Sequence, residues 1–498
     1  MKQILLFASI TIMNLFSYAA AQTLDEKLTT IFSDYQLLGM SVVEVCNNEI
    51  TFSKGYGLAD FENNLSITDS TLYRIASISK SITATALMKL YEQGLFHLDD
   101  DISDYLGFTL RNPNFPDDPI TFRMVLSHTS SIKDGNKYDQ FLSATSTQNP
   151  PPNISEYFVT GGAYFSNNVF QNKKPGTYFQ YSNANFGLLG TLIEKISGIR
   201  FDIFCKQNIF DPLLITASFN VNDLPNICNV ATLYRFQNNS WTPQADDFNC
   251  IMPAPKDLSL YVIGNNGFIY SPQGGLRISA NDLAKYMLMN ANNGTYNGIQ
   301  ILKDTTAILM RKIQWQFDGS NGDDYSGLFK AYGLGIHITT NVANSDIVFP
   351  DRRTFGHPGE AYGLVSDMYF DSLKHGVIFI TNGNKNEYII GNNSAFYTVE
   401  ADVFNAVYED LQDCFATSSA MDDEDENCFI TSNPVTDRLQ FLCDRENFNK
   451  TEIQNILGQK MICNATLSSI DVSSYCSGIY FLKLMGNKKT LVLKFIKQ

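Results

Sequence analysis

The apolar residues between positions 75 and 90 constrain this chain most, because they recur at the spacing of an amphipathic helix. The pattern begins with Ser77-Ile78-Ser79-Lys80 and runs up to Gly94, a helix stop signal. We expect Ser77 and Lys80 in the first helical turn, on one face, because residues three apart are neighbours on a helix. A desolvated lysine has a lowered pKa and can activate a hydroxyl as a nucleophile. Taken alone, the same residues also fit an ordinary helix start with a solvated lysine.

Two short motifs further along the chain could supply partners for that pair. Tyr181-Ser182-Asn183 lies between the turn at Pro175-Gly176-Thr177 and an apolar helical run. His357-Pro358-Gly359 directly precedes two segments, 361–370 and 376–381, whose alternation predicts a β-hairpin. A phenol, an amide and a glycine-lined backbone would suit a substrate cleft. Each motif alone also fits a purely structural role, as a core aromatic or a loop histidine.

The three motifs stand in the order shown by the serine β-lactamase, penicillin-binding protein and related esterase family, and the chain resembles its class C-like branch from about Tyr35 to Tyr408. The resemblance extends to the segments around the motifs, which are Tyr73-Arg74-Ile75-Ala76, Gly94-Leu95, Leu98-Asp99-Asp100, Ile120-Thr121-Phe122-Arg123, Leu126-Ser127-His128-Thr129-Ser130, Gly274-Gly275-Leu276, Asp282-Leu283-Ala284 and Tyr332-Gly333-Leu334-Gly335. It implies an α/β fold of the β-lactamase/DD-peptidase type. In that fold an antiparallel sheet is flanked by helices and carries a helical subdomain, with the active site between sheet and helices.

The resemblance also implies catalytic roles for three residues. Ser77 would attack an ester or amide carbonyl and form an acyl-enzyme. Lys80 would take or share the serine proton. Tyr181, kept partly anionic or hydrogen-bonded by Lys80, would relay the proton to the leaving group and then help to activate water. The choice of base between Lys80 and Tyr181 stays open.

Asn183, His357, Gly359 and Glu360 are the expected substrate-binding residues. The N–H groups of Ser77 and Glu360 would form the oxyanion hole, and Asn183 would orient an amide or carboxylate of the substrate. His357 stands where β-lactamases of this class carry lysine and threonine before the glycine, and a neutral imidazole offers less charge. The resemblance therefore favours an esterase or a D-amino-acid peptidase or carboxypeptidase. A β-lactamase and a non-catalytic protein that binds peptidoglycan or β-lactams remain the alternatives.

Several residues near these motifs have a structural interpretation. Ser131 follows the histidine-threonine-serine run where the family usually has glycine, and His128 is interpreted as a packed loop residue. Substrate specificity is expected from the loops at roughly 130–175 and 215–270, because binding residues concentrate on loops. Trp315 could line the cleft or pack in the core.

The composition and the first residues favour an exported protein. Lys2, an apolar run over residues 4–16 and Ala19-Ala20-Ala21 predict a cleaved signal peptide at 1–21. No stretch approaches the ~20 apolar residues of a membrane helix, so no transmembrane anchor is expected. The net charge of -15 argues against nucleic acid as a partner. We expect a secreted or cell-surface protein with a small-molecule or peptide substrate.

The nine cysteines and five histidines lack the CxxC or His-x-His spacing of metal sites, so we expect no metal and no cofactor. Export permits disulfides. Cys228 with Cys250, or Cys414 with Cys428, would close short loops.

Two folded units are expected in the mature chain. Residues 22–412 would form the hydrolase domain, in which a hairpin over 40–55 and the later hairpin enclose a helix-rich middle, and a helix at 395–411 closes the domain. Residues 413–431 would form an acidic linker. Residues 432–498 would then form a small C-terminal β-sandwich, because about 65 residues bury only a small core.

The C-terminal unit resembles the sorting domain of the type IX secretion system of Bacteroidetes. The similar segments are Ser432-Asn433-Pro434, Leu457-Gly458-Gln459, Ile470-Asp471-Val472-Ser473, Ser477-Gly478-Ile479-Tyr480-Phe481 and Lys494-Phe495-Ile496-Lys497. The resemblance implies passage across the outer membrane with the type IX secretion machinery as a partner, after which the tail is removed or used for attachment. A small adhesive or carbohydrate-binding module is the alternative.

Overall fold

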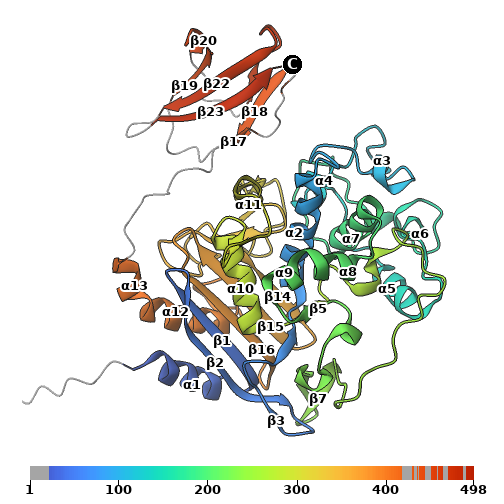
Figure 1. Ribbon diagram of the computed structural model, residues 1–498, viewed down its shortest axis with the longest axis vertical. Helices are drawn as coiled ribbons and strands as arrows, with labels where there is room; N and C mark the ends of the chain where they lie inside the picture. The colour runs from blue at the N-terminus through green and yellow to red at the C-terminus, as the bar shows by residue number, and fades with distance from the viewer. Residues whose placement is uncertain are drawn as a thin grey trace, which may run out of the picture.

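The computed structural model describes residues 22–417 and, within the C-terminal unit, 429–430, 435, 437–442, 450–456, 458–463, 469–485 and 490–497. The expected signal peptide at 1–21 and most of the expected acidic linker lie outside the described residues. The N-terminal unit is built on a nine-stranded antiparallel sheet (Figure 1). In sheet order its strands are β11 (Trp315–Gln316), β12 (Ala331–Tyr332), β13 (His337–Ile338), β14 (Thr354–Ala361), β15 (Leu364–Asp371), β16 (Gly376–Asn384), β1 (Leu37–Cys46), β2 (Glu49–Asp60) and β3 (Leu65–Ser66).

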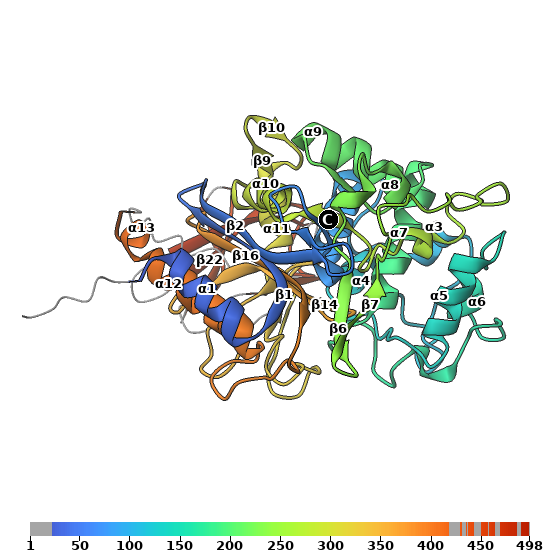
Figure 2. The same cartoon turned by 90° about the horizontal axis from the view of Figure 1, so that it is seen from below.

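Alternating side chains give the sheet two buried faces, as a period of two requires. On β16, Val377 and Phe379 belong to one apolar cluster, whereas Ile378 and Ile380 belong to a second one. The first cluster packs under α1 (Leu24–Asp34) and α12 (Thr398–Asp410), which lie side by side in both views (Figure 2). The second cluster packs against α2 (Ser79–Glu92) and α10 (Ala280–Ala291) on the opposite face. The sheet is therefore the middle layer of three.

A helix-rich insertion follows β3 and forms the second half of the N-terminal unit (Figure 1). Its helices are α3 (Ser103–Leu106), α4 (Phe122–Leu126), α5 (Tyr138–Thr147), α6 (Ser155–Phe158), α7 (Asn183–Ser197), α8 (Phe201–Cys205) and α9 (Asp211–Leu213), with a π-helical turn at Lys206–Phe210. A further helix, α11 (Asp304–Met310), follows α10. Short strands connect the insertion to the sheet: β4 (Leu72–Arg74), β8 (Arg277–Ser279) and β5 (Ala217–Ser218) form one small sheet, β6 (Leu233–Gln237) pairs with β7 (Ser240–Ala245), and β9 (Thr295–Tyr296) pairs with β10 (Ile299–Gln300). This is the expected antiparallel sheet with a helical subdomain.

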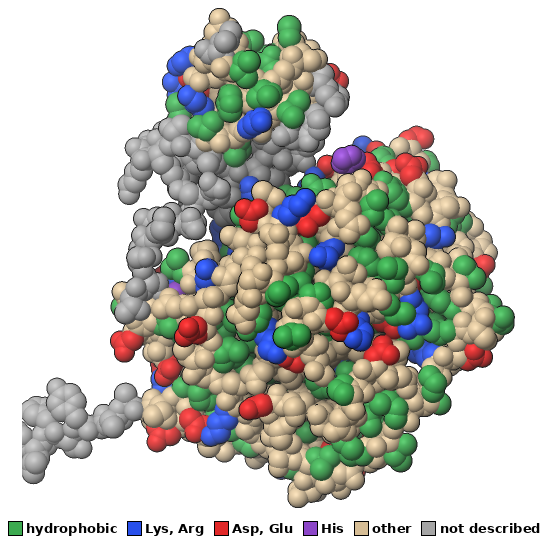
Figure 3. Space-filling model, in the orientation of Figure 1, with side chains coloured by type: hydrophobic (Ala, Val, Ile, Leu, Met, Phe, Trp, Pro, Cys, Tyr) green, Lys and Arg blue, Asp and Glu red, His purple; other side chains and the backbone are tan. Residues whose placement is uncertain are grey.

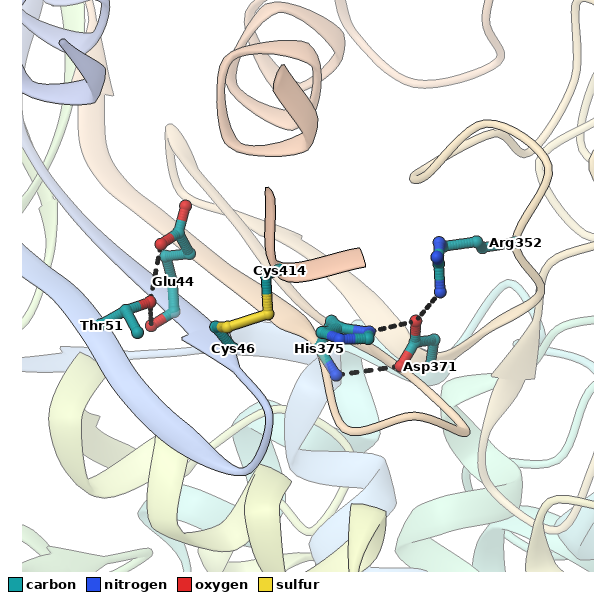
Figure 4. The surroundings of a disulfide bond; sticks show 7 residues. All are labelled: Glu44, Cys46, Thr51, Arg352, Asp371, His375 and Cys414. Atoms are coloured by element: carbon teal, nitrogen blue, oxygen red, sulfur yellow. Dashed lines mark hydrogen bonds and ion pairs between the residues drawn. A yellow bond between two sulfur atoms is a disulfide. The ribbon is translucent and has the colours of Figure 1, made fainter. Parts of the chain in front are cut away.

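A disulfide between Cys46 and Cys414 joins the end of β1 to α13 (Gln412–Thr417) (Figure 4). The predicted pairing of Cys414 with Cys428 is therefore wrong, because α13 folds back onto the end of the sheet. The Arg352 guanidinium lies 3.8 Å from the centroid of the Phe415 ring, which also packs against His375. Phe415 of α13 therefore packs against the end of the sheet. The other expected pair, Cys228 with Cys250, is bonded.

In its described segments, the C-terminal unit has two small antiparallel sheets with a common core. One contains β17 (Phe429–Ile430), β18 (Arg438–Leu442) and β21 (Ser469–Asp471), and the other β20 (Lys460–Cys463), β19 (Lys450–Asn455), β22 (Gly478–Met485) and β23 (Thr490–Lys497). Leu439 and Ile470 of the first sheet pack with Ile453, Leu482 and Phe495 of the second. β22 and β23 pair in antiparallel fashion along their whole length.

Charged side chains of both signs are interspersed on the face seen in Figure 3. Among the described residues, no helix is both long enough and apolar enough to cross a membrane. The same part of the chain holds no group of three or more His, Cys, Asp and Glu side chains arranged to bind a metal ion.

Candidate active site

Ser77 lies in a single 3-10 turn, Ala76–Ile78, that leads directly into α2. The preceding residue, Ala76, has a φ of 46°, a left-handed conformation that is strained for a side chain with a Cβ and is typical of functional turns. The turn presents a partly exposed Ser77, whereas Lys80 one turn later is completely buried. Lys80 Nζ lies 2.9 Å from Ser77 Oγ, so the three-residue spacing brings the two side chains together.

Lys80 is held by three neutral acceptors. Its Nζ donates to Ser77 Oγ, to Asn183 Oδ1 at 2.8 Å and to the Gln273 carbonyl at 2.9 Å. Burial lowers the pKa of Lys80 to about 7, and the charge of Asp134 opposes that shift. The side chain is therefore neutral in much of the population near pH 7, and a neutral amine can accept the Ser77 proton.

Tyr181 lies over this amine, just before α7. Its ring is 4.9 Å from Lys80 Nζ, 4.5 Å from the His128 ring and stacked on Phe329 at 5.1 Å. Burial raises the pKa of Tyr181, and a hydrogen bond with Ser77 only partly opposes the rise. The phenol therefore keeps its proton, which argues against the expected partly anionic form. Of the two base candidates, the lysine is the one whose pKa suits the role.

Asn183 is the first residue of α7, and Asp134 fixes its orientation. The Asp134 carboxylate accepts hydrogen bonds from Asn183 Nδ2 at 2.9 Å, the Ser182 hydroxyl at 2.9 Å and the Ala184 N–H at 2.8 Å. Because Nδ2 is held, Asn183 Oδ1 points to Lys80. Asp134 thus caps the helix from outside and positions the amide. Sequence reasoning missed this residue, because a single aspartate in a loop carries no motif.

His357 lies on β14 and is completely buried. Its Nδ1 is 2.6 Å from the Pro358 carbonyl, which only accepts, so the proton is on Nδ1. Its Nε2 then accepts from the Tyr332 hydroxyl at 2.9 Å. Burial, followed by the charge of Lys80, holds the pKa of His357 well below its ordinary value. His357 is a neutral side chain with both nitrogens engaged, and its ring lies 5.9 Å from that of Tyr181.

Gly359 brings β14 against the nucleophile turn. A Cβ at this position would lie 2.7 Å from the Ile75 carbonyl and 3.2 Å from Ser77 N, so a side chain would displace the turn. The Glu360 side chain instead accepts a hydrogen bond from the Tyr397 hydroxyl at 2.9 Å. Gly359, the residue before Glu360, therefore lies against the turn that carries Ser77 N.

His128 and Trp315 pack in the interior near the site. His128 is fully buried, and its Nδ1 accepts from the Ser182 N–H at 3.1 Å, which confirms the prediction of a packed loop residue. Trp315 is 6% exposed and stacks on Phe179 at 4.1 Å, so it belongs to the core. Tyr332 lies in the Tyr332-Gly333-Leu334-Gly335 segment, but its bond to His357 could not be foreseen from sequence.

This combination of sheet, helical subdomain and Ser77–Lys80 pair is that of a β-lactamase-type serine hydrolase fold. Residues 20–394 match the beta-lactamase family, and the chain belongs to that family. Residues 432–498 match the secretion system C-terminal sorting domain.

The chain is similar over part of its length to known proteins. Protein flp of Staphylococcus aureus (strain MRSA252) is 28% identical over 186 residues, which are 37% of this chain and 35% of that protein. The chain thus spans about a third of the length of this curated relative.

Solved structures show the same fold at low sequence identity. The octameric penicillin-binding protein homologue from Pyrococcus abyssi superposes with a TM-score of 0.58 and 21% identity, covering 95% of this chain and 89% of that one. The D-amino acid amidase from Ochrobactrum anthropi SV3, complexed with L-phenylalanine amide, gives a TM-score of 0.55 and 20% identity, covering 78% of this chain and 99% of that one.

Proposed function

We propose that this protein is a serine hydrolase that cleaves an ester or an amide through an acyl-enzyme on Ser77. The observation that carries the proposal is the buried Lys80 amine, 2.9 Å from Ser77 Oγ, with its pKa lowered to about 7. Such an amine can take the serine proton at neutral pH, which an ordinary surface lysine with a pKa near 10.4 cannot do efficiently. Membership of the beta-lactamase family supports the same assignment.

The proposed acylation begins when neutral Lys80 accepts the Ser77 proton as Oγ attacks the substrate carbonyl. The oxyanion that forms would be stabilised by the N–H groups of Ser77 and Glu360, and removing one such donor costs about 3 kcal/mol of barrier. The phenol of Tyr181 would donate its proton to the leaving group and recover one from Lys80. Collapse of the intermediate then leaves the acyl group on Ser77 and releases the alcohol or amine.

In the proposed deacylation, a water molecule replaces the leaving group. Lys80, neutral again, would take a proton from the water directly or through Tyr181, and the hydroxide equivalent would attack the acyl carbonyl. The second tetrahedral intermediate would use the same N–H pair, and protonated Lys80 would return the proton to Ser77 Oγ as the intermediate collapses. Asn183, held by Asp134, keeps the amine directed at Ser77 throughout.

Simple esters, and D-amino-acid amides or peptides, are the proposed substrate class. The third motif offers a neutral, buried His357 in place of a cation, so it supplies little attraction for the carboxylate of a β-lactam. The D-amino acid amidase among the solved relatives supports including D-amino-acid amides. A β-lactamase, or a non-catalytic protein that binds peptidoglycan or β-lactams, is the alternative.

We further propose that the protein is secreted or held at the cell surface. The match of residues 432–498 to a secretion system sorting domain supports export with the type IX machinery as a partner. The signal peptide at 1–21 stays a prediction from the sequence.

Covalent labelling of the full chain tests the proposed function. A fluorophosphonate probe or labelled penicillin should modify the wild-type protein at Ser77, and Ser77→Ala should remove the label. Ser81→Ala is the matched control, because it deletes a buried hydroxyl one turn later that donates to the Ile78 carbonyl. Folded wild-type protein that takes up no label, or Ser77→Ala protein labelled as strongly as wild type, would rule out the acyl-enzyme.

A further inference from the structure

Two arginines lie next to each other at the edge of the candidate site. Arg74 ends β4 three residues before Ser77, and it pairs across the small sheet with Arg277 on β8. The Asp246 carboxylate lies between them. Arg277 binds it with two hydrogen bonds, of 2.9 Å and 2.5 Å, whereas Arg74 Nη1 approaches it only to 4.0 Å. Asp246 therefore forms its hydrogen-bonded ion pair with Arg277 rather than with Arg74.

The positive charge of Arg74 is only partly balanced by Asp246. Its Nε donates to the Gly274 carbonyl at 3.4 Å, and its Nη groups make no hydrogen bond to any residue that the structure describes. Burial, followed by repulsion from Arg277, lowers the pKa of Arg74. An arginine remains protonated in spite of such a shift. The two guanidinium groups and one carboxylate therefore carry one net positive charge, and the Arg74 side chain is 19% exposed.

A third cation adds to this charge. Lys256 donates to the Ile269 carbonyl at 2.5 Å, and burial together with repulsion from Arg277 and Arg74 lowers its pKa to about 8. The lysine is mostly protonated at pH 7. The region around Arg74 therefore attracts anions.

The chain connects this region to the nucleophile. Gln273, whose carbonyl binds Lys80, is followed by Gly274, whose carbonyl binds Arg74. On the other side, the exposed Tyr362 directly follows β14 and its ring lies 5.1 Å from the Arg74 guanidinium carbon. Arg74 and Tyr362 thus lie at the border of the same site.

Strand β14 shows which part of a substrate would reach Arg74. The ring of His357 lies beside that of Tyr181, the Cα of Gly359 faces the turn that carries Ser77, and the ring of Tyr362 lies beside Arg74, in that order along the chain. At roughly 3.4 Å per residue, Gly359 and Tyr362 are about 10 Å apart. Tyr181, the proposed donor to the leaving group, lies toward the opposite end. A group at Arg74 therefore belongs to the acyl part of the substrate.

We propose that Arg74, with Tyr362 beside it and the Arg277–Asp246 pair behind it, binds a carboxylate in the acyl part of the substrate, about 10 Å from the scissile carbonyl at roughly 3.4 Å per strand residue. This rests on the proposed hydrolase function and narrows its substrate class to acyl groups with a distal carboxylate. The free Nη groups of a guanidinium match a carboxylate in geometry and charge.

The test compares two esters with the full chain: the p-nitrophenyl monoester of suberic acid, which carries a free carboxylate, and its neutral methyl ester. Wild type should prefer the anionic ester about tenfold in kcat/KM at low salt, as one charge-assisted contact allows. Arg74→Gln should reduce this ratio to near one, and Lys256→Gln should reduce it about threefold by removing one nearby charge. Arg111→Gln is the matched control, because Arg111 pairs with Asp101 in the helical subdomain and is 23% exposed.

Each outcome supports or overturns one of the two proposals. If the preference for the anionic ester is unchanged in Arg74→Gln and Lys256→Gln, or if the variants lose activity on both esters equally, the carboxylate site is overturned and Arg74 has a structural role only. Turnover of the methyl ester in that case still supports the hydrolase function. Hydrolysis of neither ester with no labelling of Ser77 overturns the hydrolase function itself. If Arg74→Gln does not fold, two measurements replace it: the preference of Lys256→Gln for the anionic ester, and the preference of wild type in 0.5 M salt, where the screening length is roughly 4 Å. Both preferences should be lower than that of wild type at low salt, and unchanged values would overturn the carboxylate site.

Discussion

The Asp134 carboxylate lies 2.9 Å from Asn183 Nδ2 and accepts the Ala184 N–H at 2.8 Å, so one loop aspartate both caps α7 and aims the Asn183 carbonyl oxygen at Lys80. It also acts on Lys80 through space, because its negative charge favours the protonated amine. Geometry and proton affinity in the candidate site therefore depend on a residue that contacts neither Ser77 nor Lys80 directly.

Replacing Asp134 should change both properties. Asp134→Asn keeps hydrogen-bonding groups but removes the charge, so the pKa of Lys80 should fall further and the acidic limb of kcat/KM should move to lower pH. Asp134→Ala should lower kcat/KM for esters about tenfold, because a charge-assisted hydrogen bond is worth roughly 1.5–3 kcal/mol. Asp139→Ala, an exposed aspartate on α5, is the control. A limb that stays in place or moves to higher pH in Asp134→Asn would contradict this role.

Lys80 should reduce the stability of the fold near neutral pH. The folded pKa is about 7, whereas an unfolded lysine titrates near 10.4. The unfolded state therefore binds more protons between these values, and the free energy of unfolding should rise with pH across that interval. Lys80→Met should abolish activity and stabilise the protein by a few kcal/mol at pH 7, with the advantage shrinking toward pH 10.

Chemical denaturation at pH 7 and pH 10 measures this difference. Lys206→Met, which replaces a lysine that is 44% exposed, serves as the control and should show no comparable gain. A Lys80→Met protein that is less stable than wild type at pH 7 would contradict this expectation.

The neutral third motif predicts a substrate ranking. Because both nitrogens of His357 are engaged and its pKa is lowered, no cation is available there for a β-lactam carboxylate. A simple p-nitrophenyl ester should therefore be hydrolysed with a higher kcat/KM than nitrocefin, and Ser77→Ala should lose both activities. Faster turnover of nitrocefin would show that the interpretation of His357 is wrong.

The Cys46–Cys414 disulfide should stabilise the hydrolase unit. It closes a sequence separation of 368 residues, whereas Cys228–Cys250 closes 22. In the loop-entropy description, a disulfide that closes a longer loop removes more entropy from the unfolded chain and so stabilises the fold more. Replacing both Cys46 and Cys414 with Ser should therefore lower the free energy of unfolding by about 2–4 kcal/mol or more. Cys228→Ser with Cys250→Ser should cost less. Denaturation of the two double variants checks the order, and the reverse order would contradict it.

The local parts of the site could be predicted from sequence, and the long-range parts could not. Ser77 and Lys80 share a turn, and Tyr181 and Asn183 share a loop-to-helix junction, so spacing alone predicts that each pair lies close together. Alternation predicts the β15–β16 hairpin for the same reason.

Four features needed the three-dimensional structure. The contacts of Asp134 and the bond between Tyr332 and His357 join residues far apart in sequence, so no local pattern indicates them. The proton on Tyr181 is retained because of burial, which spacing does not reveal. The partner of Cys414 depends on how α13 docks on the sheet, and proximity in sequence suggested the wrong one.

The rate of fluorophosphonate labelling of Ser77 as a function of pH tests the central claim most directly. If a buried Lys80 with a pKa of about 7 activates Ser77, the rate should rise through pH 7 and then reach a plateau, and Lys80→Met should abolish it. A rate that is independent of pH between 5 and 9, or that rises only near the ordinary lysine pKa of about 10.4, would contradict the claim.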